Sequence, residues 1–237
     1  MKQPYLRKKP KSHLKKKAQK IFQLLIRKYG EPHWHSVMPP LDELISTILS
    51  QNTNDFNRDL AFQRLRARYP SWDQMRDAPA DEVIAAIRPA GLANQKGPRM
   101  QDILQKITQE HGSLELDFLR DYSKEEARKW LLRFKGVGPK TAAIVMQFSL
   151  GIPAFPVDTH IYRVTGRLGL RPDKMSASQA HKHLENIFDP KQYPAAHLNL
   201  ILLGREICHS RQPECDTCIL KNICPYYKSV FLIKLQK

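Results

Sequence analysis

Long hydrophobic runs are missing from this sequence, and cysteines are few. No uninterrupted apolar stretch exceeds five residues, whereas a membrane-spanning helix needs about 20. The N-terminal residues lack the apolar core of a secretory signal. All four cysteines fall between residues 208 and 224, so they cannot cross-link the rest of the chain as disulfides do in secreted scaffolds. We therefore expect an intracellular, cytoplasmic protein with no membrane partner.

Acidic residues are also in short supply. The chain has 39 Lys and Arg against 23 Asp and Glu, and its formal net charge is +16. This excess indicates a polyanionic partner, with nucleic acid as the first candidate, because each Lys or Arg that replaces a counterion on a phosphate adds affinity. Residues 1–28 hold nine Lys, two Arg and no acid, which is +11 of the total. Residues 1–17 are thus predicted to be a basic, disordered tail, and contact with nucleic acid is the alternative or additional role.

Apolar residues recur at helical spacing and nowhere in a convincing alternating pattern. One stripe is formed by Leu41, Leu44, Ile45, Ile48 and Leu49, and similar stripes occur at 21–25, 100–107 and 198–202. An all-α fold follows from these patterns. The segment 139–150 is apolar nearly all round, which predicts a helix through the middle of the molecule.

A very tight turn precedes that apolar helix. The turn reads Lys135-Gly136-Val137-Gly138-Pro139-Lys140-Thr141. Its glycines allow backbone angles that other residues avoid, and Pro139 suits the first position of a helix. A helix start leaves backbone N–H groups unpaired at the positive end of the helix dipole, so this hairpin could grip a DNA phosphate without reading sequence. The alternative, which G-x-G by itself leaves open, is an ordinary corner between two helices.

Two chemically capable side chains stand at predicted helix starts. Lys140 lies in the first turn after the hairpin, where the dipole disfavours a charged ammonium and favours a neutral amine that can form a Schiff base. Eighteen residues later, Asp158 opens another predicted helix. An N-cap is the commonest role for such an aspartate, and a catalytic carboxylate is the alternative, although one residue can serve as both.

The cysteines form one closely spaced group. Cys208, Cys215, Cys218 and Cys224 follow the pattern C-x6-C-x2-C-x5-C. Structural zinc sites usually use two close pairs, and only the middle two cysteines form such a pair. One loop wrapped around a cubane iron–sulfur cluster fits the spacing better, and Pro225 repeats a proline that follows a cluster ligand in bacterial ferredoxins. Zinc stays the alternative from spacing alone.

Taken together, GVGPKTA at 136–142, VDTH at 157–160 and the four-cysteine loop closely resemble the endonuclease III family of helix-hairpin-helix DNA glycosylases. The resemblance covers about residues 18–228. It implies a six-helix domain over 38–155 and a second domain made by 18–37 and 156–228, which carries a 4Fe-4S cluster on the four cysteines. DNA would lie across the cleft between the domains, and residues 229–237 would be a C-terminal tail.

The resemblance also implies an activity. The protein would be a monomeric, bifunctional DNA glycosylase/AP lyase of base excision repair, and it would act beside the chromosomal DNA on duplexes with damaged bases or abasic sites. Lys140 would be the attacking amine, and Asp158 would assist loss of the base from a nucleotide flipped out of the stack. Oxidised pyrimidines are the expected lesions. The hairpin contact to DNA would be made by Gly136, Val137, Gly138 and Lys140.

Two further DNA contacts are implied by position. Leu92 resembles the family's wedge, which fills the space left by the flipped base, and a surface leucine after a glycine turn is the alternative. Asn52 stands where the family commonly carries a glutamine that contacts the opposite strand, although the adjacent Gln51 could substitute. This departure, and Lys135 where the family often has proline, leave the preferred opposing base open.

Two other functions compete with this interpretation. A glycosylase of the same fold that only removes bases lacks a lysine at the position of Lys140, so lyase activity distinguishes it. A non-catalytic DNA-binding or redox protein would keep the hairpin and the cluster, but it would leave Lys140 and Asp158 without a joint purpose.

Overall fold

The computed structural model describes residues 11–32 and 37–231. Its contacts divide the chain into two compact units. We call residues 35–152 the hairpin unit, and residues 1–34 together with 153–237 the cysteine unit. Within the described ranges every regular element is helical and none is a β-strand, which confirms the all-α prediction. None of the helices in these ranges is both long and apolar enough to cross a membrane.

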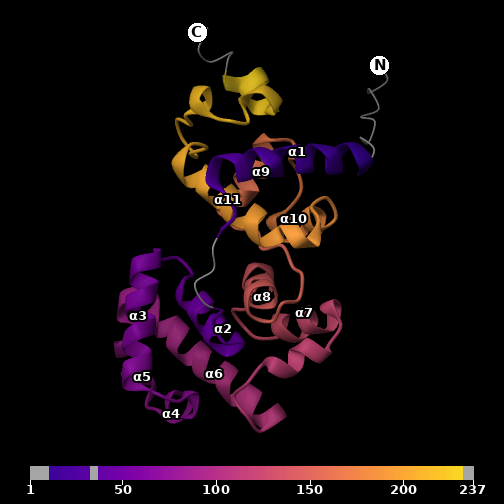
Figure 1. Cartoon of the computed structure of the whole chain (residues 1–237). Helices are drawn as coiled ribbons and strands as arrows, with labels where there is room; N and C mark the ends of the chain where they lie inside the picture. The colour runs from indigo at the N-terminus through magenta and orange to yellow at the C-terminus, as the bar shows by residue number, and fades with distance from the viewer. Residues whose placement is uncertain (1–10, 33–36, 232–237) are drawn as a thin grey trace, which may run out of the picture. The chain divides into compact units, whose positions relative to one another are not determined.

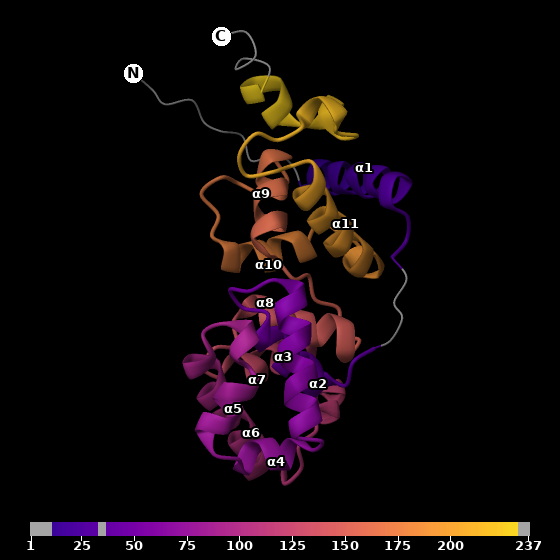
Figure 2. The ribbon, with the colours of Figure 1, turned by 90° about the vertical axis from the view of Figure 1, so that its left-hand side faces the viewer.

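The hairpin unit packs its helices around α6 and α8 (Figures 1 and 2). Its helices are α2 (Pro40–Leu49), α3 (Asp55–Arg68), α4 (Trp72–Asp77), α5 (Ala80–Ala86), α6 (Ala93–His111), α7 (Lys124–Leu132) and α8 (Pro139–Ile144). The apolar stripes predicted at 41–49 and 100–107 lie in α2 and α6 and are buried. Helix α2 also contacts α3 and α8. Ser71 and Ser123 cap α4 and α7 through reciprocal bonds with Gln74 and Glu126, which explains why these short helices start where they do.

The apolar segment 139–150 changes its helical form part-way. The α-helical turns of α8 end at Ile144, and a π-helical turn follows over Val145–Ser149. Burial continues through both parts and includes Ala142, Val145 and Met146. Contacts with α2 and α7 surround α8, so the segment lies in the core of the hairpin unit.

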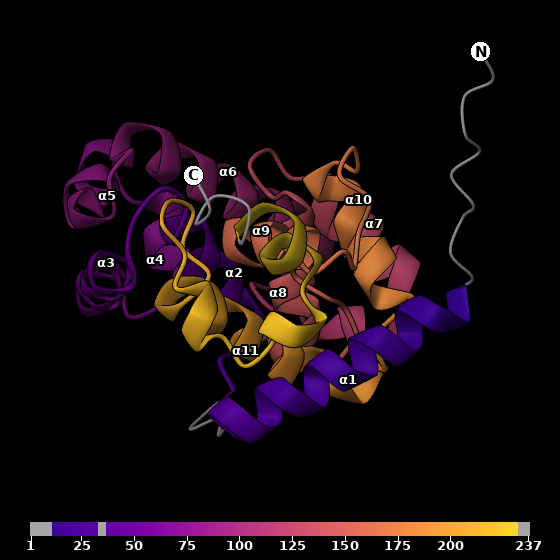
Figure 3. The ribbon, with the colours of Figure 1, turned by 90° about the horizontal axis from the view of Figure 1, so that it is seen from above.

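The cysteine unit brings together segments from both ends of the chain. Its helices are α1 (Lys11–Tyr29), α9 (Thr159–Arg167), α10 (Ala177–Glu185) and α11 (Tyr193–Glu206), followed by short helical turns at Cys215–Thr217, Lys221–Ile223 and Tyr227–Phe231. Helix α11 contacts α9 and α1 (Figures 1 and 3). Their shared core contains Ile21, Leu25, Ile161, Val164 and Leu203.

Residues 11–17 are helical, so the prediction of a disordered tail was wrong for them. The high positive charge of this segment is interleaved with apolar residues at helical spacing. Leu14, Ala18, Ile21 and Leu25 recur at helical offsets on one face of α1; the last three are fully buried, and Leu14 packs against the same core. Residues 1–10 and 232–237, which belong to the predicted N-terminal and C-terminal tails, lie outside the described residues.

The change from one unit to the other comes after Ile152, three residues before the predicted boundary at 155. Phe155 accounts for the difference. Its side chain is fully buried in the core of the cysteine unit, where it stacks on Phe188 at 5.2 Å and meets Tyr193 edge-on at 5.4 Å between ring centroids. An aromatic core residue at this point ties the connecting segment to the cysteine unit.

Candidate functional site

The turn between α7 and α8 has the tight form that its glycines predict. Val137 is buried beneath the turn, and its N–H donates to the carbonyl of Phe134 at 3.0 Å. Gly138 is the N-cap residue of α8, and no side chain caps this helix. The first N–H groups of α8 are therefore left without a side-chain acceptor, which is the arrangement that suits contact with a phosphate.

Gly136 suits its place in the turn through its backbone angle, and it lies close to a neighbouring side chain. Its φ is 89°, in the left-handed region, and a β-carbon there would collide with the side chain of Arg99. The Gly136 carbonyl accepts a hydrogen bond from Gln51 Nε2 at 2.9 Å. The turn is thus held by Gln51, which lies just beyond the end of α2.

Lys140 is exposed in the first turn of α8, whereas the next three side chains, Thr141, Ala142 and Ala143, are buried. Those buried neighbours fix the rotation of the helix and keep the lysine outside the core. An exposed amine beside the hairpin is free to meet an external electrophile, which is the position expected for a nucleophile.

Asp158 is the N-cap residue of α9 in the cysteine unit. Its Oδ1 accepts a hydrogen bond from the N–H of Ile161 at 2.7 Å. This confirms the N-cap alternative derived from the sequence. Among the described residues, the second carboxylate oxygen has no hydrogen-bond partner, so capping leaves that oxygen available for another role.

The four cysteines surround one cavity inside the cysteine unit. Cys208, Cys215, Cys218 and Cys224 all line it, together with apolar residues of α9 and α11, and all four are free thiols. No group of three or more His, Cys, Asp or Glu side chains in the described ranges is arranged to hold a single metal ion. The four thiols therefore surround a cavity, and they do not converge on a position for a single ion.

Burial acts against the charged form of these thiols. It raises the pKa of Cys215 to about 11, and it also raises the pKa values of Cys218 and Cys224. Arg167 also lines this cavity, and its Nη1 lies 3.3 Å from the sulfur of Cys208. A positive centre inside the cavity would offset this effect of burial and favour the thiolates of Cys215, Cys218 and Cys224.

Residues 45–190 match the model of the HhH-GPD superfamily of base excision DNA repair proteins. The chain belongs to this superfamily. An Arabidopsis thaliana protein provisionally named a DNA glycosylase is 40% identical over 144 residues, which are 61% of this chain and 49% of that protein. Endonuclease III of Sulfolobus acidocaldarius is 32% identical over 186 residues, which are 78% of this chain and 81% of that relative.

A solved structure extends the likeness to nearly the whole chain. The structure of a trapped endonuclease III–DNA covalent intermediate superposes with a TM-score of 0.79 at 27% identity, and the match covers 94% of this chain and 99% of that one. Within the superfamily, the chain is a member of the endonuclease III family. The family resemblance drawn from the three motifs is confirmed.

The loop that resembles the family's wedge has an unusual backbone. Gly91 and Leu92 both have positive φ, at 67° and 50°, and the Leu92 side chain is 47% exposed. Leucine rarely takes the left-handed conformation, which costs a residue with a β-carbon about 1–2 kcal/mol. An exposed apolar side chain held on a strained backbone is a candidate functional feature.

Gln51 and Asn52, the two candidates for contact with the opposite strand, lie in different environments. Gln51 is half-buried and uses its amide on the hairpin carbonyl, whereas Asn52 is exposed and has a φ of 54°. Asparagine tolerates the left-handed region better than most residues. Asn52 is thus the residue presented to solvent, and Gln51 holds the loop from within.

Lys96 was not recognised from the sequence, yet it links these loops. It is 2% exposed, and its ammonium donates to three backbone carbonyls. The signal was present: Lys96 precedes Met100 by four residues and Ile103 by seven, so it falls on the buried stripe of α6. A lysine at such a position must have partners that satisfy its charge.

Proposed function

We propose that this protein is a bifunctional DNA glycosylase/AP lyase of base excision repair, acting on double-stranded DNA that contains oxidised pyrimidines or abasic sites. The observation that carries the proposal is the exposed Lys140 in the first turn after the braced glycine hairpin. The superfamily supports base excision, and the fold match to a trapped covalent intermediate supports attack by a protein nucleophile.

The proposed reaction begins after the damaged nucleotide has left the base stack. The neutral amine of Lys140 attacks C1′ of the sugar, and the bond to the base breaks with its electron pair leaving on the base, which takes up a proton. Asp158 stabilises the positive charge that develops on the sugar as this bond breaks. The attached amine then loses a proton, the C1′–O4′ bond breaks as O4′ takes up a proton, and an imine between Lys140 and C1′ of the opened sugar results.

Strand cleavage follows from the same imine. Loss of a proton from C2′ places the electron pair in conjugation with the imine, and the C3′–O bond breaks to release the strand on the 3′ side of the lesion, which leaves with a 5′ phosphate. Water then hydrolyses the imine and frees Lys140. The hairpin's role in this scheme is affinity, since backbone N–H groups at a helix start bind phosphate without selecting a base.

We further propose that Cys208, Cys215, Cys218 and Cys224 hold a 4Fe-4S cluster. The donor set fits this group, because four thiols within one short loop line a single cavity, and their spacing has only one close pair where zinc sites usually have two. When bound, the cluster would supply a cationic iron–sulfur core that joins the four cysteines of the segment after α11. In this proposal the cluster has no part in the bond-breaking steps.

Metal analysis tests the cluster directly. We expect the purified protein to contain about four iron and four acid-labile sulfide per chain. Cys215→Ala should lose both, because Cys215 is the most buried of the four thiols. Asn222→Ala, which changes an exposed residue of the same loop, is the matched control and should retain the iron. Zinc at about one ion per chain without sulfide would contradict the assignment.

The activity is tested with two duplexes, one carrying a thymine glycol and one carrying an abasic site, each with and without borohydride. Loss of the lesion with strand nicking and a trapped covalent adduct supports the bifunctional enzyme. Base loss without a nick or an adduct would instead support an enzyme that only removes bases. Binding of both duplexes without any product would favour a non-catalytic DNA-binding protein.

A further inference from the structure

Lys96 is a fully satisfied charge inside the hairpin unit. Its Nζ lies 2.7 Å from the carbonyl oxygen of Leu49, 2.6 Å from that of Gln51 and 2.9 Å from that of Ala90. Burial lowers the pKa of Lys96 to about 8, so the ammonium keeps all three N–H donors at neutral pH. Each donor has one acceptor, and all three acceptors are backbone atoms.

The three carbonyls belong to two different loops. Leu49 and Gln51 lie at and just beyond the end of α2, immediately before Asn52. Ala90 ends the short turn Arg88–Ala90, two residues before Leu92. Lys96 therefore connects the backbone that presents Asn52 to the backbone that presents Leu92.

Both of these loops contain a residue whose backbone needs external support. Asn52 and Leu92 have φ values of 54° and 50°, and residues with a β-carbon stay in the left-handed region only where surrounding contacts hold them. Gln51 adds a further tether, since its side chain donates to the carbonyl of Gly136. One lysine and one glutamine thus join the segments around residues 52, 92 and 136.

We propose that Lys96 is a positioning residue that holds Asn52 and Leu92 at a fixed separation. Asn52 can then contact the opposite strand while Leu92 fills the space left by the flipped base. This inference rests on the proposed function, in which those two side chains meet DNA. Lys96 itself is buried and touches no substrate. A purely structural role would be to satisfy the last carbonyls of α2, which also attract a cation.

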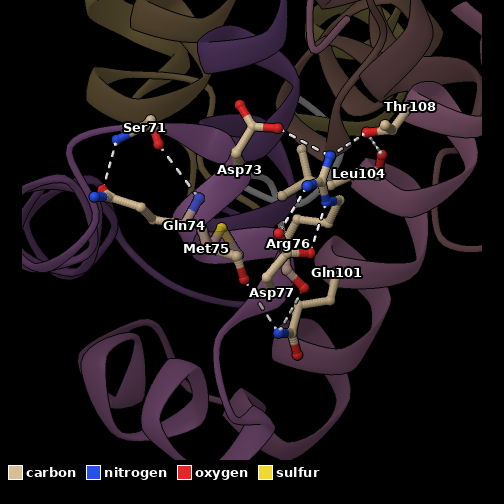
Figure 4. A network of polar contacts seen from close by, with 9 residues as sticks. All are labelled: Ser71, Asp73, Gln74, Met75, Arg76, Asp77, Gln101, Leu104 and Thr108. Atoms are coloured by element: carbon tan, nitrogen blue, oxygen red, sulfur yellow. Dashed lines mark hydrogen bonds and ion pairs between the residues drawn. The ribbon is translucent and has the colours of Figure 1, made fainter. Parts of the chain in front are cut away.

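A matched control for Lys96 lies on the same helix. Gln101 is 8% exposed, and its Nε2 donates to the carbonyls of Met75 at 3.1 Å and Ala78 at 2.8 Å. Figure 4 shows this side chain reaching the last turn of α4 at Met75, beside the ion pairs of Arg76 with Asp73 and Asp77. Gln101 thus holds the C-terminal end of α4 and the residue that follows it through bonds to backbone carbonyls, as Lys96 does for its loops, but this segment contains no predicted DNA contact.

The experiment compares two reactions of each variant. One is release of thymine glycol from a duplex, which needs base flipping and contact with both strands. The other is borohydride trapping on an abasic site in single-stranded DNA, which needs the amine of Lys140 but neither a wedge nor an opposite strand. The ratio of the two rates is independent of the fraction of folded protein, because an unfolded molecule contributes to neither.

We expect Lys96→Met to lower this ratio by about tenfold to a hundredfold, since small misplacement of groups that orient a substrate has effects of that size. Gln101→Met should leave the ratio within about twofold of the wild-type value, even if it destabilises the protein by a similar amount. An unchanged ratio in Lys96→Met, or an equal fall in Gln101→Met, would overturn the positioning role. Absence of product from the wild-type protein would refute the proposed function instead.

Lys96→Gln is the second variant, for use where the methionine does not fold. It keeps two amide donors and so leaves part of the carbonyl network satisfied. Combined with Leu92→Ala, it should lower the ratio by less than the product of the two single effects, because a loop already released from its tether has less wedge function to lose. Effects that multiply in full would show that Lys96 does not act through Leu92.

Discussion

The Lys140→Gln variant is expected to form no borohydride-stable adduct with abasic DNA and to nick it about 10³-fold more slowly or worse, because removal of a covalent nucleophile has effects of at least that size. Glutamine has a similar length but offers no nucleophilic amine, so the imine cannot form. Lys140 is exposed, and we expect the free energy of unfolding to change by no more than about 0.5 kcal/mol. Denaturation and single-turnover nicking assays check the two parts.

Lys135→Gln is the matched control for this prediction. Lys135 is an exposed lysine of the same hairpin, so its substitution removes one positive charge near DNA without removing the proposed nucleophile. We expect the adduct to persist. Binding to DNA should be weaker, and the slope of log K against log salt concentration should decrease in magnitude by about one. An adduct that survives in Lys140→Gln would assign the chemistry to another amine. An adduct lost equally in both variants would point to a defect in DNA binding.

The parts of the fold that the sequence predicts well are those set by local chemistry. The G-V-G turn, Pro139 and the apolar residues after it define the hairpin and α8 because each acts within a few neighbouring residues. The cysteine spacing likewise places four thiols around one cavity, since the ligands lie in one short loop. Asp158 as an N-cap follows from the same kind of local rule.

The features that escaped prediction depend on contacts between distant segments. The many lysines of residues 11–17 made the amphipathic pattern of α1 hard to detect in the sequence. The helix that α1 packs against, α11, lies far along the chain. Lys96 bonds carbonyls 45 and 47 residues before it, and nothing near it in sequence marks those acceptors. Gln51 and Asn52 could not be told apart by register alone, because their difference lies in which side chain reaches the hairpin carbonyl.

The second large effect is expected for Asp158→Asn, which separates the charge of this residue from its role as a helix cap. An asparagine oxygen can still accept from the N–H of Ile161, and asparagine is as good an N-cap as aspartate, so the free energy of unfolding should change by only a few tenths of a kcal/mol. The negative charge that stabilises the sugar as the base departs is lost. We expect thymine glycol release in a single-turnover assay to slow by about 10²–10³-fold, the size typical for removal of one stabilising group.

The same variant should react differently with a preformed abasic site. There the base has already gone and the amine of Lys140 attacks an aldehyde, so borohydride trapping should fall by far less than base release. Asp158→Ala loses the cap as well and should cost about 1 kcal/mol of stability, which isolates the contribution of capping. Base release at the wild-type rate in Asp158→Asn, with the helix cap intact, would leave Asp158 as an N-cap alone and would assign stabilisation of the departing base to another group.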